Sequence, residues 1–96
     1  MHALIRTYAG PGAKELMDLI VEKQGEIEGL IRGVSGFVSY ILVPTGDGGA
    51  TVTVCEDKAG TDESSRRASE WVKENVSATA DPPAITEGDT VLQFGS

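Results

Sequence analysis

The sequence predicts an α+β domain of the βαββαβ type, in which a four-stranded antiparallel sheet carries two helices on one face. Apolar residues follow a strand period and then a helical period, in the order strand, helix, strand, strand, helix, strand. A glycine-rich hairpin signal separates the second and third strands. The chain has 96 residues, enough for one domain, expected over residues 1–96. This element order is the split βαβ, or ferredoxin-like, arrangement.

The first half of the chain begins with a strand at residues 2–8, which a turn at residues 9–12 ends. From Ala13 the apolar residues recur in steps of three and four, as on one face of a helix. Glycines recur every fourth residue on its outer side, and each costs about 1 kcal/mol in an exposed helix. We expect the helix to break near Gly25 and restart, and the alternative is an outer surface that contacts another chain.

The central hairpin combines a strand at residues 36–43, a loop at residues 44–49 and a return strand at residues 51–55. The second strand has apolar residues on both faces: Phe37, Ile41 and Val43 on one, and Val38, Tyr40 and Leu42 on the other. An antiparallel sheet covered on one side normally has polar residues on the other. We therefore predict a homodimer whose sheets pack face to face, a dimeric α+β barrel.

The last two elements are a second helix and a final strand. Thr61 or Asp62 is expected to cap the helix, which runs to about Val76. The Asp81-Pro82-Pro83 segment imposes an extended connector. The final strand is expected at residues 90–94, where apolar residues lie on both sides.

Composition excludes several classes of function. With 8 basic and 15 acidic residues the net charge is −7, which disfavours binding to nucleic acids or acidic membranes. The longest apolar run, residues 40–43, is far shorter than the ~20 residues of a membrane helix, and no secretory signal is recognisable. The single cysteine excludes an intrachain disulfide and a cysteine-rich zinc site, and a single histidine disfavours a histidine-built metal centre. We expect a cytoplasmic protein without a bound metal.

Four segments together resemble a known family: Arg6-x-Tyr8, residues 34–40 (VSGFVSY), the hairpin at residues 46–54, and residues 64–72 of the second helix. On these segments the chain resembles the dimeric α+β barrel superfamily, and most of all the antibiotic-biosynthesis-monooxygenase type of domain. The resemblance covers nearly all 96 residues. Its motifs describe shape rather than chemistry, so they indicate the fold more strongly than an activity.

The resemblance implies an activity and a set of candidate residues. Cofactor-independent oxygenases of aromatic polyketides in this superfamily place Asn, Trp and Tyr side chains in a cavity between helices and sheet. By similarity, Trp71, Asn75, Tyr8 and Tyr40 are candidate catalytic residues, and no cofactor is expected. Haem-degrading members need a histidine that holds iron, and His2 at the start of the first strand lies in the wrong element.

Each candidate also has a structural interpretation. Trp71 can be a core residue, and Asn75 can be a hydrogen-bond partner at the end of the helix. The two tyrosines can lie in the sheet with their hydroxyls at its rim. Arg6, on a strand, needs a carboxylate partner, water or a bound anion, so it is either half of an ion pair or the anchor of an acidic or carbonyl-bearing ligand. The function stays open between a monooxygenase of an aromatic substrate, a non-catalytic binder of small ligands, and a structural or interaction protein.

Overall fold

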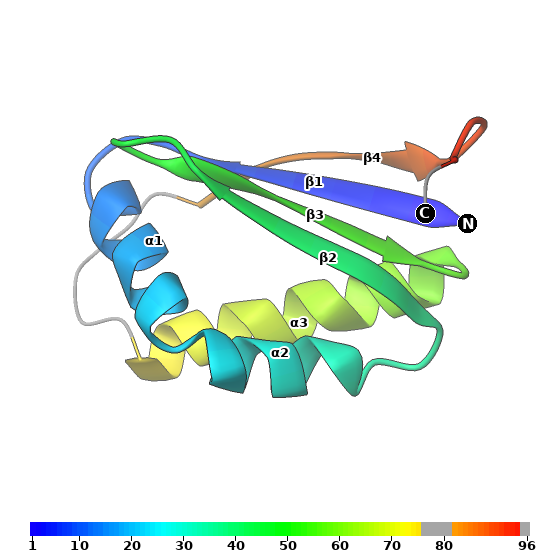
Figure 1. Cartoon of the computed structure of the whole chain (residues 1–96), viewed down its shortest axis with the longest axis horizontal. Helices are drawn as coiled ribbons and strands as arrows, with labels where there is room; N and C mark the ends of the chain where they lie inside the picture. Colours follow the sequence, from blue (N-terminus) through cyan, green and yellow to red (C-terminus); the bar gives the residue numbers. More distant parts are fainter. Residues whose placement is uncertain (76–81, 95–96) are drawn as a thin grey trace.

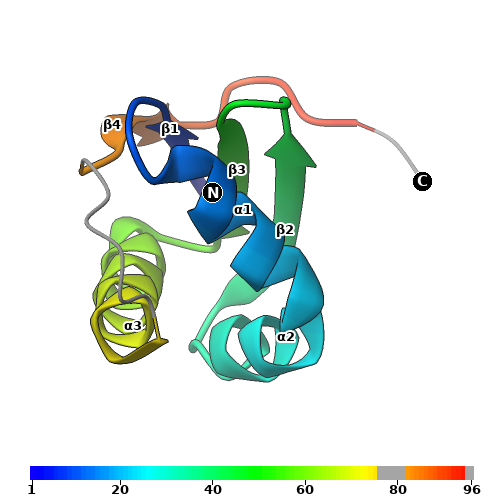
Figure 2. The same ribbon diagram turned by 90° about the vertical axis from the view of Figure 1, so that its left-hand side faces the viewer.

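A helical layer covers one face of a four-stranded antiparallel sheet and leaves the other face open (Figures 1 and 2). The structure is a computed structural model that describes residues 1–75 and 82–94. The strand order is β2-β3-β1-β4. The predicted ferredoxin-like α+β fold is therefore confirmed. Its elements are β1 (His2–Tyr8), α1 (Ala13–Glu22), α2 (Gln24–Arg32), β2 (Phe37–Pro44), β3 (Gly49–Cys55), α3 (Lys58–Asn75) and β4 (Ala84–Asp89).

The first helical segment is broken, as predicted, but the break lies at Lys23. This residue leaves helical geometry, at φ −107° and ψ 31°, and its N–H bonds the carbonyl of Leu19 at 2.9 Å. A Cβ on Gly25 or Gly29 would meet no atom within 4 Å. These two glycines therefore face open space within the described chain. The break lets α1 contact β3 while α2 contacts β2.

The helix α3 begins three residues earlier than the predicted cap at Thr61. The Asp57 carboxylate accepts a hydrogen bond from the N–H of Gly60 at 3.1 Å, so Asp57 caps the first turn. Thr61 instead lies inside the helix and donates its hydroxyl hydrogen to the carbonyl of Lys58 at 3.0 Å. The prediction was wrong because aspartate and threonine are both good N-cap residues. Asp57 precedes Thr61 in the sequence, and Asp57 is the residue that caps the helix.

The last strand is β4, at Ala84–Asp89, and the prediction of a strand at residues 90–94 is wrong. The strand pairs with β1 from Thr7↔Ala84 to His2↔Asp89. The N–H of Thr90 then bonds the carbonyl of Met1 at 2.9 Å, and the ladder ends there. Figure 2 shows residues 90–94 crossing above the open face of the sheet instead of pairing within it.

A β-bulge in β2 changes which side chains face the helices. The register with β3 shifts between Phe37 and Ser39, so Phe37 pairs with Cys55 while Tyr40 pairs with Thr53. Phe37 therefore shares the helix-facing side with Tyr40 and Leu42, whereas the simple alternation had placed it with Ile41 and Val43. The extra residue in the bulge accounts for this error.

The core lies between the sheet and the helices. Its buried residues come from β1, from the broken helix and from α3, and they are Tyr8, Ala13, Leu16, Met17, Ile20, Ile27, Ile31 and Trp71. Partly buried apolar residues of β2, such as Phe37 and Leu42, pack against this cluster. No helix among the described residues is long and apolar enough to cross a membrane.

Candidate functional site

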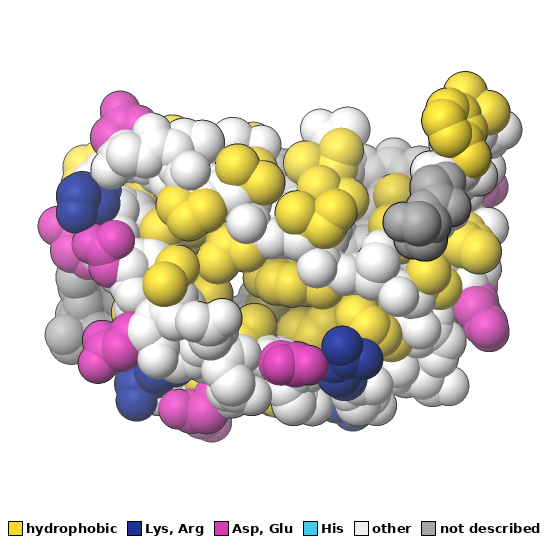
Figure 3. All heavy atoms as spheres, in the orientation of Figure 1, with side chains coloured by type: hydrophobic (Ala, Val, Ile, Leu, Met, Phe, Trp, Pro, Cys, Tyr) yellow, Lys and Arg dark blue, Asp and Glu magenta, His cyan; other side chains and the backbone are white. Residues whose placement is uncertain are grey.

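Among the described residues, two open hollows lie between the helical layer and the sheet, one beside α3 and one beside α2. The first, here called the α3 cavity, has a volume of about 390 Å³ and is lined by Arg6, Tyr8, Ser65, Ser69, Lys73 and Pro83, among others. The second, here called the α2 groove, has about 600 Å³ and is lined by residues that include Ile27, Ile31, Phe37, Tyr40 and Leu42. Figure 3 shows hydrophobic side chains gathered in a hollow between β2 and α2, where this groove lies.

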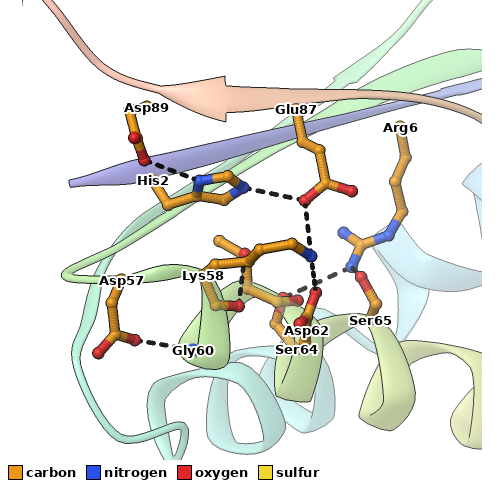
Figure 4. Close-up of polar contacts among 11 residues, drawn as sticks. His2, Arg6, Asp57, Lys58, Gly60, Asp62, Ser64, Ser65, Glu87 and Asp89 are labelled. Carbon is orange, nitrogen blue, oxygen red and sulfur yellow. Dashed lines mark hydrogen bonds and ion pairs between the residues drawn. The ribbon is translucent and has the colours of Figure 1, made fainter.

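Arg6 is the most unusual residue of the α3 cavity. Alternation along β1 turns it toward the helices, where it is only 4% exposed. Its Nη1 donates to Thr53 Oγ1 at 3.3 Å. Its Nη2 donates to Ser64 Oγ at 3.5 Å and to Ser65 Oγ (Figure 4). No carboxylate among the described residues forms an ion pair with Arg6. The predicted ion pair is thus not found within the described part of the chain.

Tyr8 lies two residues further along β1 and lines the same cavity. Burial raises the pKa of Tyr8 above its ordinary value of 10, and the positive charge of Arg6 offsets only part of this rise. Tyr40 lies on β2 and lines the α2 groove, and burial raises its pKa to about 12. Both phenols therefore stay protonated at neutral pH. They can donate a hydrogen bond but cannot serve as bases.

Trp71 and Asn75 do not meet the tyrosines in one cavity. Trp71 is 7% exposed and belongs to the core, and its indole N–H donates to Glu26 Oε1 at 3.5 Å. Asn75 is exposed at the end of α3, where its side-chain amide donates to the carbonyl of Trp71 at 2.9 Å. Of the five predicted site residues, Arg6 and Tyr8 line the α3 cavity together, and Trp71 contacts the core cluster of Tyr8 without being among the residues that line the cavity.

The hydroxyl partners of Arg6 were not predicted from the sequence. Ser64 is fully buried, and its hydroxyl donates to the carbonyl of Thr61 at 2.7 Å, which leaves its oxygen free to accept from Arg6. Thr53 is fully buried on the neighbouring strand. The sequence does contain a signal for these partners, since Ser64 and Ser65 lie on the inner face of an amphipathic helix. Buried serine hydroxyls need a polar partner, and Arg6 provides one.

A second polar cluster lies at the other end of β1, away from the α3 cavity. Both ring nitrogens of His2 contact carboxylates of β4: Nε2 is 2.9 Å from Glu87 Oε1, and Nδ1 is 3.2 Å from Asp89 Oδ1 (Figure 4). Lys58 also approaches Glu87, at 3.4 Å, and bonds Asp62. Hydrogen bonds to Glu87 and Asp89 raise the pKa of His2 above its ordinary value of 6.5. The imidazole is thus engaged in holding β4 to β1.

We expect this cluster to make stability depend on pH in a defined direction. Because the folded-state pKa of His2 is raised, its stabilisation is fully present below about pH 6.5 and is lost as the pH rises through the folded-state pKa. Thermal unfolding between pH 5 and 8.5 should show the stability advantage of the native chain over His2→Asn shrinking as the pH rises. A constant difference between the two proteins across this range would contradict the assignment.

The comparisons with known proteins bear on the fold. No known protein family matches the sequence, and no curated protein matches it. Solved structures match over nearly the whole chain. The heme-degrader MhuD from Mycobacterium tuberculosis, with two hemes bound in its active site, has 17% identity and a TM-score of 0.68, covering 99% of this chain and 100% of that chain.

Two oxygenases match in the same way. A monooxygenase from Streptomyces coelicolor, in complex with the ligand Nanaomycin D, has 19% identity and a TM-score of 0.65, covering 99% of this chain and 91% of that chain. SnoaB, a cofactor-independent oxygenase from Streptomyces nogalater, has 10% identity and a TM-score of 0.60, covering 99% and 96%. The predicted resemblance is confirmed at the level of the fold.

Proposed function

We propose that this protein is a homodimeric, cofactor-independent monooxygenase that acts on an aromatic substrate bound in the α3 cavity. The supporting observation is that Arg6 and Tyr8 share one cavity, whose other walls include apolar side chains of α1, α3 and β4. Its volume of about 390 Å³ is within the range of about 300–1,000 Å³ of small-molecule sites. The oxygenases among the matched structures are consistent with this chemistry.

The proposed reaction uses the electrons of the substrate itself. The phenol releases its hydroxyl proton to water, and the resulting phenolate reduces dioxygen. One oxygen atom then enters the ring as a quinone carbonyl while that ring carbon loses its hydrogen as a proton. The other oxygen atom takes up the two released protons and leaves as water. The cavity contributes orientation and an apolar shell. The guanidinium of Arg6 stabilises the acidic or carbonyl oxygen of the ring, and the protonated hydroxyl of Tyr8 donates a hydrogen bond.

Oxygen uptake tests this proposal. The purified protein, without added metal or organic cofactor, should consume oxygen when it is given an electron-rich phenol such as 1-naphthol. Arg6→Gln should lower the rate at least about tenfold, the order of effect of removing one positioned donor. Asn75→Ala is the matched control, because Asn75 is exposed and its described hydrogen bond is to its own helix, so its rate should stay unchanged.

A non-catalytic ligand binder is the alternative. Among the described residues that line the α3 cavity there is no carboxylate, imidazole or thiol that could remove a proton from a substrate, and burial keeps Tyr8 protonated. This favours a role in binding. If phenols bind in the cavity but no oxygen is consumed, the monooxygenase proposal fails and the binder is supported.

The proposed dimer uses the open face of the sheet. The register places Ala3, Ile5, Thr7, Ser39, Ile41, Val43, Ala50, Val52, Val54, Ala84, Thr86 and Gly88 on this face. None of these residues is charged, and Ile41 and Val43 are 54% and 48% exposed in the single chain. A second copy would cover them, so sedimentation at micromolar concentration should give twice the chain mass of 10.1 kDa. A mass of one chain would contradict the dimer.

A further inference from the structure

The α3 cavity combines a buried cation with mainly neutral surroundings. Arg6 is 4% exposed, and its described partners are three hydroxyl groups, those of Thr53, Ser64 and Ser65. A hydroxyl satisfies a hydrogen bond but carries no charge to offset a guanidinium removed from water. The three hydroxyls therefore accept hydrogen bonds from Nη1 and Nη2 but do not neutralise the charge of the guanidinium, and they leave it with further N–H groups for a ligand.

The rest of the lining adds positive rather than negative charge. Lys73 lines the same cavity from the outer part of α3, and no described lining residue is acidic. The rest of the lining includes four apolar side chains, those of Leu16, Ala68, Val72 and Ile85. Figure 4 shows Arg6 extending from β1 toward the serines of α3, so its guanidinium lies between the strand and the helix that enclose the cavity.

From this geometry we infer that the ligand of the α3 cavity is an aromatic organic anion whose carboxylate or phenolate oxygen contacts the guanidinium of Arg6. A carbonyl oxygen would accept a hydrogen bond from Arg6 but would leave its charge uncompensated. A planar carboxylate matches the paired N–H donors of an arginine and neutralises it. The inference rests on the proposed function only in placing the ligand in this cavity, and it narrows the substrate class from aromatic to acidic aromatic.

Matched neutral and acidic probes test the inference by calorimetry under anaerobic conditions, where no turnover occurs. The native chain should bind 2-naphthoate about ten- to a hundredfold more tightly than 2-naphthamide, the range of a charged hydrogen bond. With 2-naphthol, binding should tighten when the pH is raised so far that the phenolate forms. Tightening with naphthol but no preference for naphthoate would identify phenolate as the ligand form.

Variants separate a charge effect from a folding effect. Arg6→Gln should bring the affinity for 2-naphthoate close to that for 2-naphthamide while leaving the amide affinity unchanged, and Arg6→Lys should restore part of the preference. Lys73→Gln, at the exposed rim, should change the preference less than Arg6→Gln does. Asp81 lies outside the described residues, directly before the cavity-lining Pro82, so Asp81→Asn is measured as well.

Three results would overturn the inference: equal binding of acid and amide by the native chain without tighter binding of 2-naphthol at high pH, no binding of any probe, or a preference for the acid that is created only by Asp81→Asn. The last would show that the charge of Arg6 is already neutralised within the native chain. Failure of the proposed function is a separate result. A protein that prefers naphthoate but never consumes oxygen supports the anion site and refutes the oxygenase, whereas equal turnover of neutral and acidic phenols does the reverse.

Discussion

Replacing Trp71 with alanine is expected to lower the free energy of unfolding by about 3–5 kcal/mol, the usual cost of removing a large aromatic side chain from a core. Trp71 is only 7% exposed and packs in the cluster that includes Tyr8, Leu16 and Met17. Its removal leaves a void between α3 and the rest of the helical layer. Urea unfolding followed by far-ultraviolet circular dichroism measures the loss without relying on tryptophan fluorescence.

Trp71→Phe is the matched control for this prediction. Phenylalanine keeps an aromatic ring in the core and loses the long contact with Glu26, at 3.5 Å. We expect a smaller loss of stability than for alanine, with the oligomeric state unchanged. An alanine variant as stable as the native chain would remove Trp71 from the core and reopen its role as a substrate contact.

Replacing Ile41 with aspartate is expected to convert the proposed dimer fully to monomers. Ile41 is 54% exposed on the open face of the single chain and would be covered by a second copy. A carboxylate buried there without a partner carries a large desolvation penalty. Sedimentation should then report 10.1 kDa instead of twice that mass.

Ile85→Asp is the control for the substitution at Ile41. Ile85 is 52% exposed, nearly as much as Ile41, but it pairs with Arg6 and lies on the helix-facing side of the sheet. It should leave the sedimentation mass unchanged. Dissociation by both substitutions would point to general destabilisation, and dissociation by neither would refute the open face as the interface.

Hydrophobic periodicity is sufficient to predict the order of the elements, but pairing partners decide where some of them lie. Residues 90–94 have the apolar pattern of a strand, yet Val91 and Phe94 are 98% and 87% exposed. β4 lies instead in an exposed segment that contains glycine and two acidic residues. Its position is set by the free edge of β1, a long-range constraint that a local pattern does not contain.

The faces of the sheet were partly predictable. Arg6 and Tyr8 are two residues apart on one strand, so they must share a face, and they share the α3 cavity. The bulge near Phe37 breaks the same rule in β2, and no residue type in that segment marks it. Trp71 and Asn75 share a helix face, but Trp71 is buried and Asn75 is exposed, because Asn75 lies at the end of α3.

The alternation along β1 links the two surfaces of this molecule. Leu4, Arg6 and Tyr8 face the helices, while Ile5 and Thr7, from the same strand, face the side that a second subunit would cover. A shift of this strand moves both sets together. Ligand affinity and subunit affinity are then thermodynamically reciprocal: a ligand that binds the assembled form more tightly by some factor strengthens assembly by the same factor. Measuring assembly with and without 2-naphthoate would quantify that coupling.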